Sequence, residues 1–237
     1  MLAGATACEP APIADGERRT ALRGTTERVI LPTYRELVSS TSTLADELSA
    51  LESSGEAADA AEALAQVGLA PARQAYLDAR GPFEESLAFA FGPAIDLHSL
   101  ANIDAMPIDA EKLDALLAGD GKLDVKAVRV LGSNKRGLHG IEYLLFPEGD
   151  EALEAALLAD DEAGRRRRQY LSSAARVVAD AAQALSLAWL PEGGDFARRF
   201  SEPGGPDSVS DTVQASLDTL LNECVYLSEV VANSKLG

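Results

Sequence analysis

Residues 137–146 read GLHGIEYLLF and set an imidazole and a carboxylate three residues apart inside an otherwise apolar run. In a helix, residues at i and i+3 lie on one face, so His139 and Glu142 can converge on a single point. A neutral imidazole nitrogen and a carboxylate oxygen together suit zinc or iron better than calcium or magnesium. Gly137 and Gly140 add little bulk, which lets another backbone or a ligand approach closely. The stretch therefore predicts a helix with a candidate transition-metal site.

The sequence around this stretch predicts an all-α protein. Its 237 residues are rich in Ala and Leu, aromatic residues make up only 5%, and β-branched residues are few, which favours helix over sheet. The formal net charge of -17 leaves no broad basic face to neutralise phosphates, so nucleic acid is excluded as a partner.

Apolar residues recur at helical spacing in every long segment, which predicts a helical bundle over residues 26–190 that carries the Gly-x-His-x-x-Glu motif. Residues 1–25 contain scattered prolines and glycines and are expected to be a flexible tether. Residues 191–207 are rich in Gly and Pro and are expected to be a linker, followed by a further amphipathic helix within 208–237. The run of arginines at 165–168 is expected to be mostly a solvated face beside acidic residues.

Shorter features inside the predicted bundle are less regular. Pro32 lies early in the first helix, where a first turn tolerates it or a kink follows. Residues 93–103 are expected to form one helix. Residues 125–131 are ambiguous, because their β-branched side chains fit a strand whereas their neighbours favour a helix.

The motif and its flanks resemble a known family. Gly-x-His-x-x-Glu followed by Tyr-Leu-Leu-Phe is similar to the signature of the imelysin family of bacterial envelope proteins. Weaker similarities occur in the expected order from about Thr26 to the end of the chain. They are VILPTYREL at 29–37, FAFGP at 89–93, IDAMPID at 103–109, and RQYL at 168–171 leading to Trp189. Met106 stands where many relatives have tryptophan, and Leu87 where many have glutamate, which puts one acidic ligand in doubt.

The resemblance implies a fold of two packed helical bundles, a link to iron acquisition, and a place in the periplasm or outer envelope. This chain resembles the first bundle plus the opening helix of the second. That last helix carries an apolar stripe, so we expect it to pack back on the first bundle, to self-associate, or to pair with a separately encoded partner. Other iron-uptake envelope proteins are further expected partners.

The stretch before Cys8, residues 2–7, resembles the end of a bacterial lipoprotein signal, in which the cysteine becomes lipidated. No positively charged region or full apolar region precedes it. Two interpretations are open. In the first, Cys8 carries a lipid anchor, and either the start codon is misplaced or an upstream signal was removed. In the second, the likeness is due to chance.

A site at His139 and Glu142 needs at least one more ligand. Glu36 is the first candidate, because the first helix is expected to pack beside the motif helix and bundle cores commonly build metal sites from facing helices. Other oxygen donors that could complete the site are Glu84, Glu85, Asp104 and Asp109. A two-histidine zinc site would also need His98, the other histidine of the chain, which is expected to be solvated or to cap a helix.

Three functions remain open at this point. The first is a binding protein linked to iron acquisition, with iron or zinc or a small ligand near the motif. The second is a metal-dependent peptidase, although Tyr143 stands where the His-x-x-Glu-His pattern needs histidine and the His-Glu-x-x-His pattern is absent. The third is a helical interaction module in which the His-Glu pair only orders the core.

Overall fold

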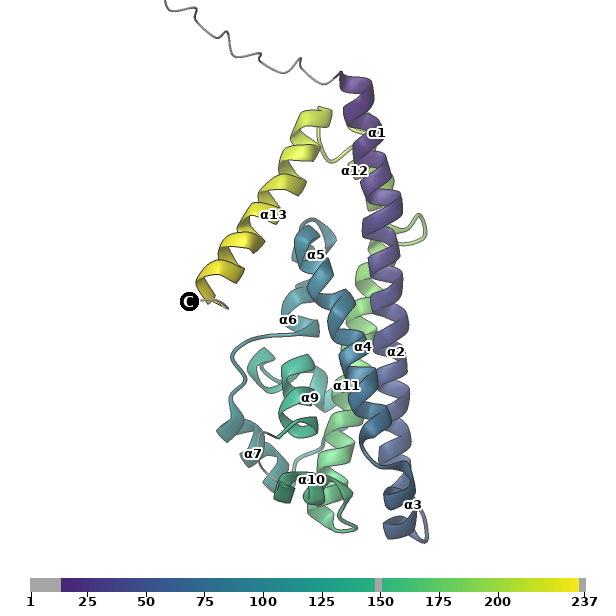
Figure 1. Ribbon diagram of the computed structural model, residues 1–237, viewed down its shortest axis with the longest axis vertical. Coiled ribbons are helices and arrows are strands. Elements are labelled where there is room, and N and C mark those ends of the chain that lie inside the picture. Colours follow the sequence, from purple (N-terminus) through teal and green to yellow (C-terminus); the bar gives the residue numbers. More distant parts are fainter. Residues whose placement is uncertain (1–13, 148–150, 235–237) are drawn as a thin grey trace, which may run out of the picture.

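The computed structural model describes residues 14–147 and 151–234, and within these ranges every regular element is a helix. The all-α prediction is confirmed (Figure 1). In chain order the elements are α1 (Asp15–Thr25), η1 (Thr26–Ile30), α2 (Leu31–Ser54), α3 (Ala60–Val67), α4 (Ala70–Ser86), η2 (Leu87–Phe89), α5 (Pro93–Asp96), α6 (Ser99–Ile103), α7 (Ala110–Ala118), α8 (Val125–Arg129), η3 (Ser133–Lys135), α9 (Leu138–Leu145), α10 (Glu151–Leu158), α11 (Glu162–Trp189), α12 (Phe196–Ser201) and α13 (Val213–Ser234).

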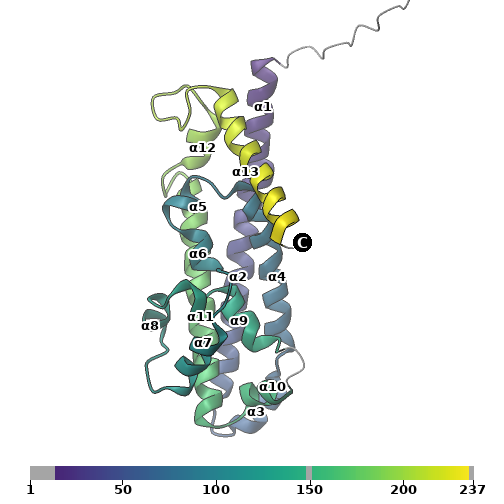
Figure 2. The same cartoon turned by 90° about the vertical axis from the view of Figure 1, so that its left-hand side faces the viewer.

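Three long helices, α2, α4 and α11, form the centre of the molecule, and the short helices α5 to α10 cover one side of α11 (Figure 2). The most extensive packing joins α2 to α11. Leucines on α2 such as Leu44 and Leu48 are fully buried, and so are small residues on α11 such as Ala174 and Ala182. Small side chains on α11 let the two backbones approach while the leucines fill the space between them.

The first helical rod is longer than the sequence predicts. α1 runs through the π-helical turn η1 into α2, so residues 15–25 are helical rather than part of a tether. Leu22 is fully buried, which explains why this segment packs on the bundle. Pro32 has no N–H to donate to the preceding turn, and the widened turn η1 lies at that point. Residues 1–13, including Cys8, lie outside the described residues.

Arginine side chains fix the ends of several helices. In the run at 165–168, Arg165 is exposed as predicted, but Arg166 and Arg167 are partly buried and Arg168 is buried, so the prediction of a mostly solvated face is wrong. Arg168 is 1% exposed and donates from Nη1 to the carbonyl oxygens of Leu157 and Ala159, at the end of α10. Arg166 donates to three carbonyl oxygens at and beyond the end of α7. Free carbonyls at a helix C-terminus attract cations, so these guanidiniums hold the short helices against α11.

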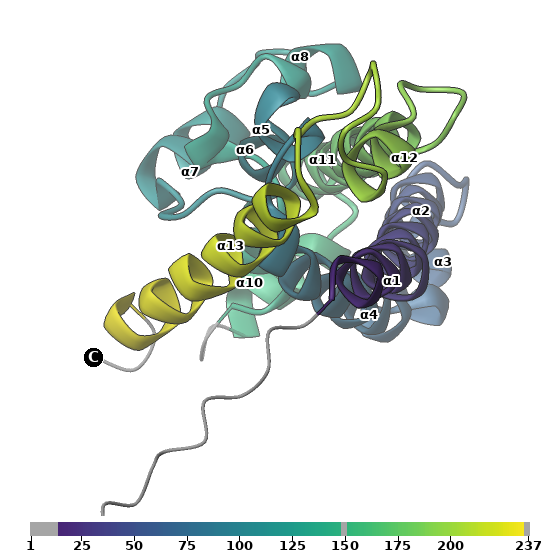
Figure 3. The ribbon, with the colours of Figure 1, turned by 90° about the horizontal axis from the view of Figure 1, so that it is seen from above.

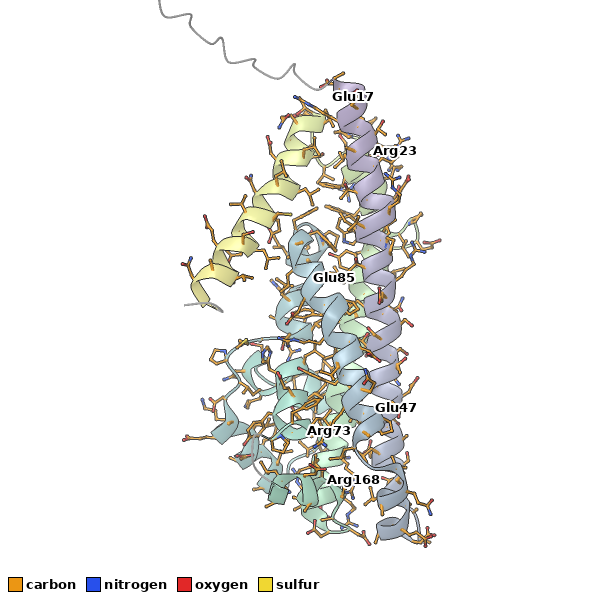
Figure 4. The ribbon with its side chains drawn as sticks, viewed as in Figure 1. Glu17, Arg23, Glu47, Arg73, Glu85 and Arg168 are labelled. Atoms are coloured by element: carbon orange, nitrogen blue, oxygen red, sulfur yellow. The ribbon has the colours of Figure 1, made fainter. Side chains whose placement is uncertain are left out.

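Arg73 of α4 binds the C-terminal end of α9 in the same way. Its Nε donates to the carbonyl of Leu145 at 2.8 Å, and its Nη2 pairs with Glu154 of α10 at 2.9 Å. Figure 4 labels Arg73 and Arg168 at the same end of the bundle, where α10 and the start of α11 lie. Arg73 therefore joins the end of the motif helix to α4 and, through Glu154, to α10.

An aromatic cluster closes the other end of the bundle. Trp189, the last residue of α11, is fully buried, and its ring contacts those of Tyr34, Phe91, Phe196 and Phe200 at centroid distances of 5.5, 5.8, 4.8 and 6.1 Å. Phe196 and Phe200 belong to α12, a helix in the segment expected to be a linker. Their burial against Trp189 explains why this Gly- and Pro-rich segment contains a helix.

The last helix, α13, contacts α1 and η2, and its far end runs away from α1 (Figure 3). Val213 and Ser216 near its start are buried, whereas Leu221, Val225 and Tyr226 further along are more than half exposed. Part of the predicted apolar stripe thus packs back on the bundle, and self-association through the remainder stays a prediction. Within the described ranges, the longer helices all lack a stretch of sufficient length and apolarity to pass through a lipid bilayer.

Replacing Trp189 by Ala should lower the free energy of unfolding by about 3–5 kcal/mol, because the change removes a fully buried aromatic side chain and leaves a cavity. Urea denaturation followed by circular dichroism measures this loss. Leu187→Ala is the matched control on the same helix: Leu187 is 40% exposed, so its change should stay within about 0.5 kcal/mol. Equal, small effects of both variants would show that the cluster does not hold this end of the bundle together.

Candidate functional site

The candidate site forms where three segments meet: α4, the loop between α6 and α7, and the N-terminal turn of α9. α9 packs on α11, α4 and α10. His139 and Glu142 both lie on α9, as the sequence predicts, and the loop after α6 contributes Asp104. The fixed position of α9 therefore sets the direction in which the motif side chains point.

The glycines of the motif make two close approaches possible. Gly137 precedes α9 with a φ of 89°, in the left-handed region that favours glycine. A Cβ atom there would lie 2.8 Å from the carbonyl oxygen of Ile103, so only glycine lets the end of α6 pass this close. Gly140 faces the hydroxyl of Tyr170, which a Cβ atom would approach to 2.4 Å. The space at Gly137 is thus taken by backbone and that at Gly140 by a side chain.

Asp104 is the centre of a hydrogen-bond network. Its Oδ1 accepts the backbone N–H of His139 at 2.9 Å and also contacts Nδ1 of the His139 ring. Its Oδ2 accepts from Nη1 of Arg80 at 2.9 Å. Gly137 at the N-cap position has no side chain to cap α9, so the Asp104 carboxylate supplies that cap from another part of the chain.

This contact fixes the ring of His139. A carboxylate only accepts hydrogen bonds, so Nδ1 is the donor, and in the neutral form of the ring the lone pair is on Nε2. Nε2 lies 3.9 Å from Oε2 of Glu142, and the His139 side chain is 14% exposed whereas that of Glu142 is 45% exposed. Nε2 of His139 and Oε2 of Glu142, the two atoms that could bind a metal ion, thus lie at the solvent-facing edge of a buried network.

The separation of these two atoms suits a shared metal ion. Ligand bonds from zinc to imidazole nitrogen and carboxylate oxygen are each about 2.1 Å, so a tetrahedral ion would place the donors roughly 3.4 Å apart. A small rotation of the half-exposed Glu142 side chain closes the difference. A carboxylate on one imidazole nitrogen, with the other nitrogen free, is the usual surrounding of a metal-bound histidine.

Two further side chains of α4 complete the surroundings. Tyr76 is buried, and its hydroxyl makes no hydrogen bond of normal geometry to the described residues. Burial raises the pKa of Tyr76 above its ordinary value; Arg80 opposes this rise, and the nearby charge of Glu142 adds to it. Burial lowers the pKa of Arg80, but Tyr76, Asp104 and Glu84 outweigh it, so the net pKa is raised and the guanidinium stays charged. Tyr76 therefore remains a neutral donor close to Glu142.

The other residues considered from the sequence lie elsewhere. Glu36 is exposed on α2, which packs chiefly on α11 and α4, and in the described ranges no hydrogen bond or ion pair joins it to His139 or Glu142. His98 is exposed at the N-cap of α6, with a φ of 50°, where the expected single helix breaks into α5 and α6. Asp109 caps α7. In the part of the chain that the structure describes, no three His, Cys, Asp or Glu side chains are grouped so as to hold a metal ion.

Sequence reasoning included Asp104 among several oxygen donors but missed its position at the centre of the network, and it missed Arg80 altogether. Arg80 and Glu84 stand four residues apart on α4 and pair at 2.9 Å. That spacing is visible in the sequence, but it indicates only a local ion pair. The link from Arg80 to Asp104 depends on the packing of the loop against α4.

Comparisons with known proteins agree with the resemblance in the sequence. Residues 30–237 match the model of the imelysin family. A curated relative, iron-regulated protein A of Synechococcus elongatus, is 27% identical over 218 residues, which are 91% of this chain and 53% of the relative. The chain therefore spans about half the length of that protein.

Two solved structures share the fold. One, described as an iron-regulated protein A precursor from Parabacteroides distasonis, aligns with a TM-score of 0.76 at 22% identity. The alignment covers 95% of this chain and 61% of the solved chain. The other, an imelysin-like protein from Psychrobacter arcticum, aligns with a TM-score of 0.64 at 17% identity and covers 94% of this chain and 63% of its own.

Replacing Asp104 by Asn should lower the free energy of unfolding by about 1.5–3 kcal/mol, because hydrogen bonds to a charged group contribute that much and the change removes the charge that Arg80 and His139 share. Urea titrations give the value. Asp96→Asn, the same change at an exposed position of α5, should stay within about 0.5 kcal/mol. If the two variants are equally stable, Asp104 does not anchor the site.

Proposed function

Because this chain belongs to the imelysin family, we propose that it is an iron-linked protein of the cell envelope that binds a transition metal ion, iron or zinc, through His139 and Glu142. The fixed ring of His139 carries the proposal. Asp104 occupies Nδ1, so that Nε2 is presented to Glu142 at 3.9 Å. Two relatives have iron-regulated in their names, which supports the link to iron.

The donor set favours metal binding over a purely structural pair. A structural His-Glu pair would be satisfied internally, whereas here the internal partner of the ring is Asp104 and Glu142 remains half-exposed. The Tyr76 hydroxyl adds a buried donor beside the Glu142 carboxylate, which raises the pKa of Tyr76 both by its charge and by a hydrogen bond.

Two protein ligands leave several coordination positions to water or to a small chelator. Such a site suits an ion that is picked up and handed on better than one that is held permanently. Glu36 as a third ligand, an anchor at Cys8 and other iron-uptake envelope proteins as partners remain parts of the proposal that need their own tests. The peptidase alternative has less support, because the other histidine, His98, is exposed at the start of α6.

Glu142→Gln should weaken the binding of Fe(II) and Zn(II) by roughly 10–100-fold or more, since even changes to groups around the ligands cost that much. Anaerobic isothermal titration of the metal-free protein measures the affinity. This variant is better than His139→Ala for the purpose, because His139 also satisfies Asp104 and its loss would disturb the fold. Glu142 is half-exposed, so the melting temperature without metal should hardly change.

His98→Ala is the matched control, because it removes the other imidazole of the chain at an exposed position. It should bind both metals as the wild type does. If the wild type binds neither metal with a dissociation constant below about 1 mM, or if Glu142→Gln binds both unchanged, the pair serves only the fold and the proposal is wrong.

A further inference from the structure

A pocket that does not include the motif side chains lies between α6, α8 and α11. Its volume is about 230 Å³, and Arg129, Arg136, Asn102 and Asp180 line it together with apolar side chains such as Leu97 and Val177. Ligand pockets for drug-sized molecules usually measure about 300–1,000 Å³, so this pocket suits a smaller molecule. In Figure 2, α8 lies at the outer edge of the short-helix layer, on the far side of α11 from α10.

One of the segments that contribute to this pocket is positively charged, in contrast to the chain as a whole. Residues 122–136 contain the cations Lys122, Lys126, Arg129, Lys135 and Arg136 and the single carboxylate Asp124. The whole chain has a formal net charge of -17. A local positive region on an acidic protein attracts anions to that region and raises their local concentration.

The two arginines of the pocket differ in how far they are already paired. Arg136 is held by the chain itself: its Nε donates to the carbonyl of Leu131 at 3.0 Å and its Nη2 to Oδ1 of Asn102 at 2.8 Å. Arg129 is half-exposed, and in the described ranges its one partner is Asp180, reached through Nη2. Its remaining N–H groups are available to a ligand, because a guanidinium has five donors.

The charges in the pocket are not balanced. Arg129 and Arg136 face one carboxylate, that of Asp180. Burial and the nearby Arg129 guanidinium lower the pKa of Arg136 below its ordinary value. An anion in the pocket would relieve the repulsion between the two cations, while the apolar wall from Leu97 and Val177 would pack against a short hydrocarbon part.

From this arrangement we infer that the pocket between α6, α8 and α11 binds a small organic carboxylate, with Arg129 as the chief ligand for the carboxylate group and Asp180 as the internal counter-ion that the ligand displaces. Arg136 lines the same pocket and holds Asn102, two residues before Asp104. The inference concerns a site other than His139 and Glu142 and stands without metal binding.

Titration of the metal-free protein with butyrate at low ionic strength tests the inference, with butyramide as the neutral molecule of the same shape. We expect saturable binding of butyrate with a dissociation constant of about 1 mM or lower and binding of butyramide at least tenfold weaker. Amide signals of α6, α8 and α11 should shift in a ¹H–¹⁵N spectrum. Equal binding of the two compounds, shifts confined to other helices, or no binding below about 10 mM would overturn the inference.

Two variants sharpen the test. Arg129→Ala should weaken butyrate binding at least tenfold, and Asp180→Asn should strengthen it several-fold, because the competing carboxylate is gone. The Arg129–Asp180 pair is about half-exposed, so neither change should affect the melting temperature much. Arg165→Ala, which removes a similarly exposed and paired arginine elsewhere on α11, is the control and should bind as the wild type does. Weaker binding by Asp180→Asn would contradict the displaced counter-ion.

Discussion

The site depends on one buried carboxylate. Asp104 is 7% exposed on its side chain, and it joins three segments that are distant in sequence by accepting from Arg80, from the backbone of His139 and from the ring of His139. Burial of a charge is costly unless hydrogen bonds satisfy it, and here three donors do so. Because these bonds fix both the start of α9 and the orientation of its histidine, the position of Nε2 follows from a requirement of the fold.

The bundle supports this arrangement by fixing the ends of short helices. Helices of eight or nine residues such as α7, α9 and α10 are marginal on their own, and in this molecule arginines bind their last carbonyls: Arg166 for α7, Arg73 for α9 and Arg168 for α10. All three arginines come from the long helices α4 and α11. The long helices therefore supply both the apolar core and the polar attachments that hold the site layer in place.

The sequence predicted the features that depend on local spacing. Helical periodicity was sufficient for α2, α4, α11 and α13, and the i, i+3 spacing placed His139 and Glu142 on one face of α9. Features that depend on tertiary packing were not predictable in the same way. Burial of Leu22 and Phe196 stabilises the helices α1 and α12, whose sequences have only weak helical patterns. Arg168 is buried, although it belongs to a run of four arginines that is typical of a solvated surface. The contact of Asp104 with His139 was likewise not predictable from spacing, since the end of α6 approaches α9 this closely only because Gly137 has no Cβ atom.

The tautomer of His139 is the most direct test of this account. The chain has two histidines, so a long-range ¹H–¹⁵N spectrum of metal-free protein at pH 7.5 contains only two imidazole rings, and His98→Ala assigns them. We predict that His139 carries its proton on Nδ1 and keeps Nε2 unprotonated, and that Asp104→Asn alters this pattern while leaving His98 unchanged. A His139 ring protonated on Nε2, or a His139 pattern that is unchanged in Asp104→Asn, would contradict the account.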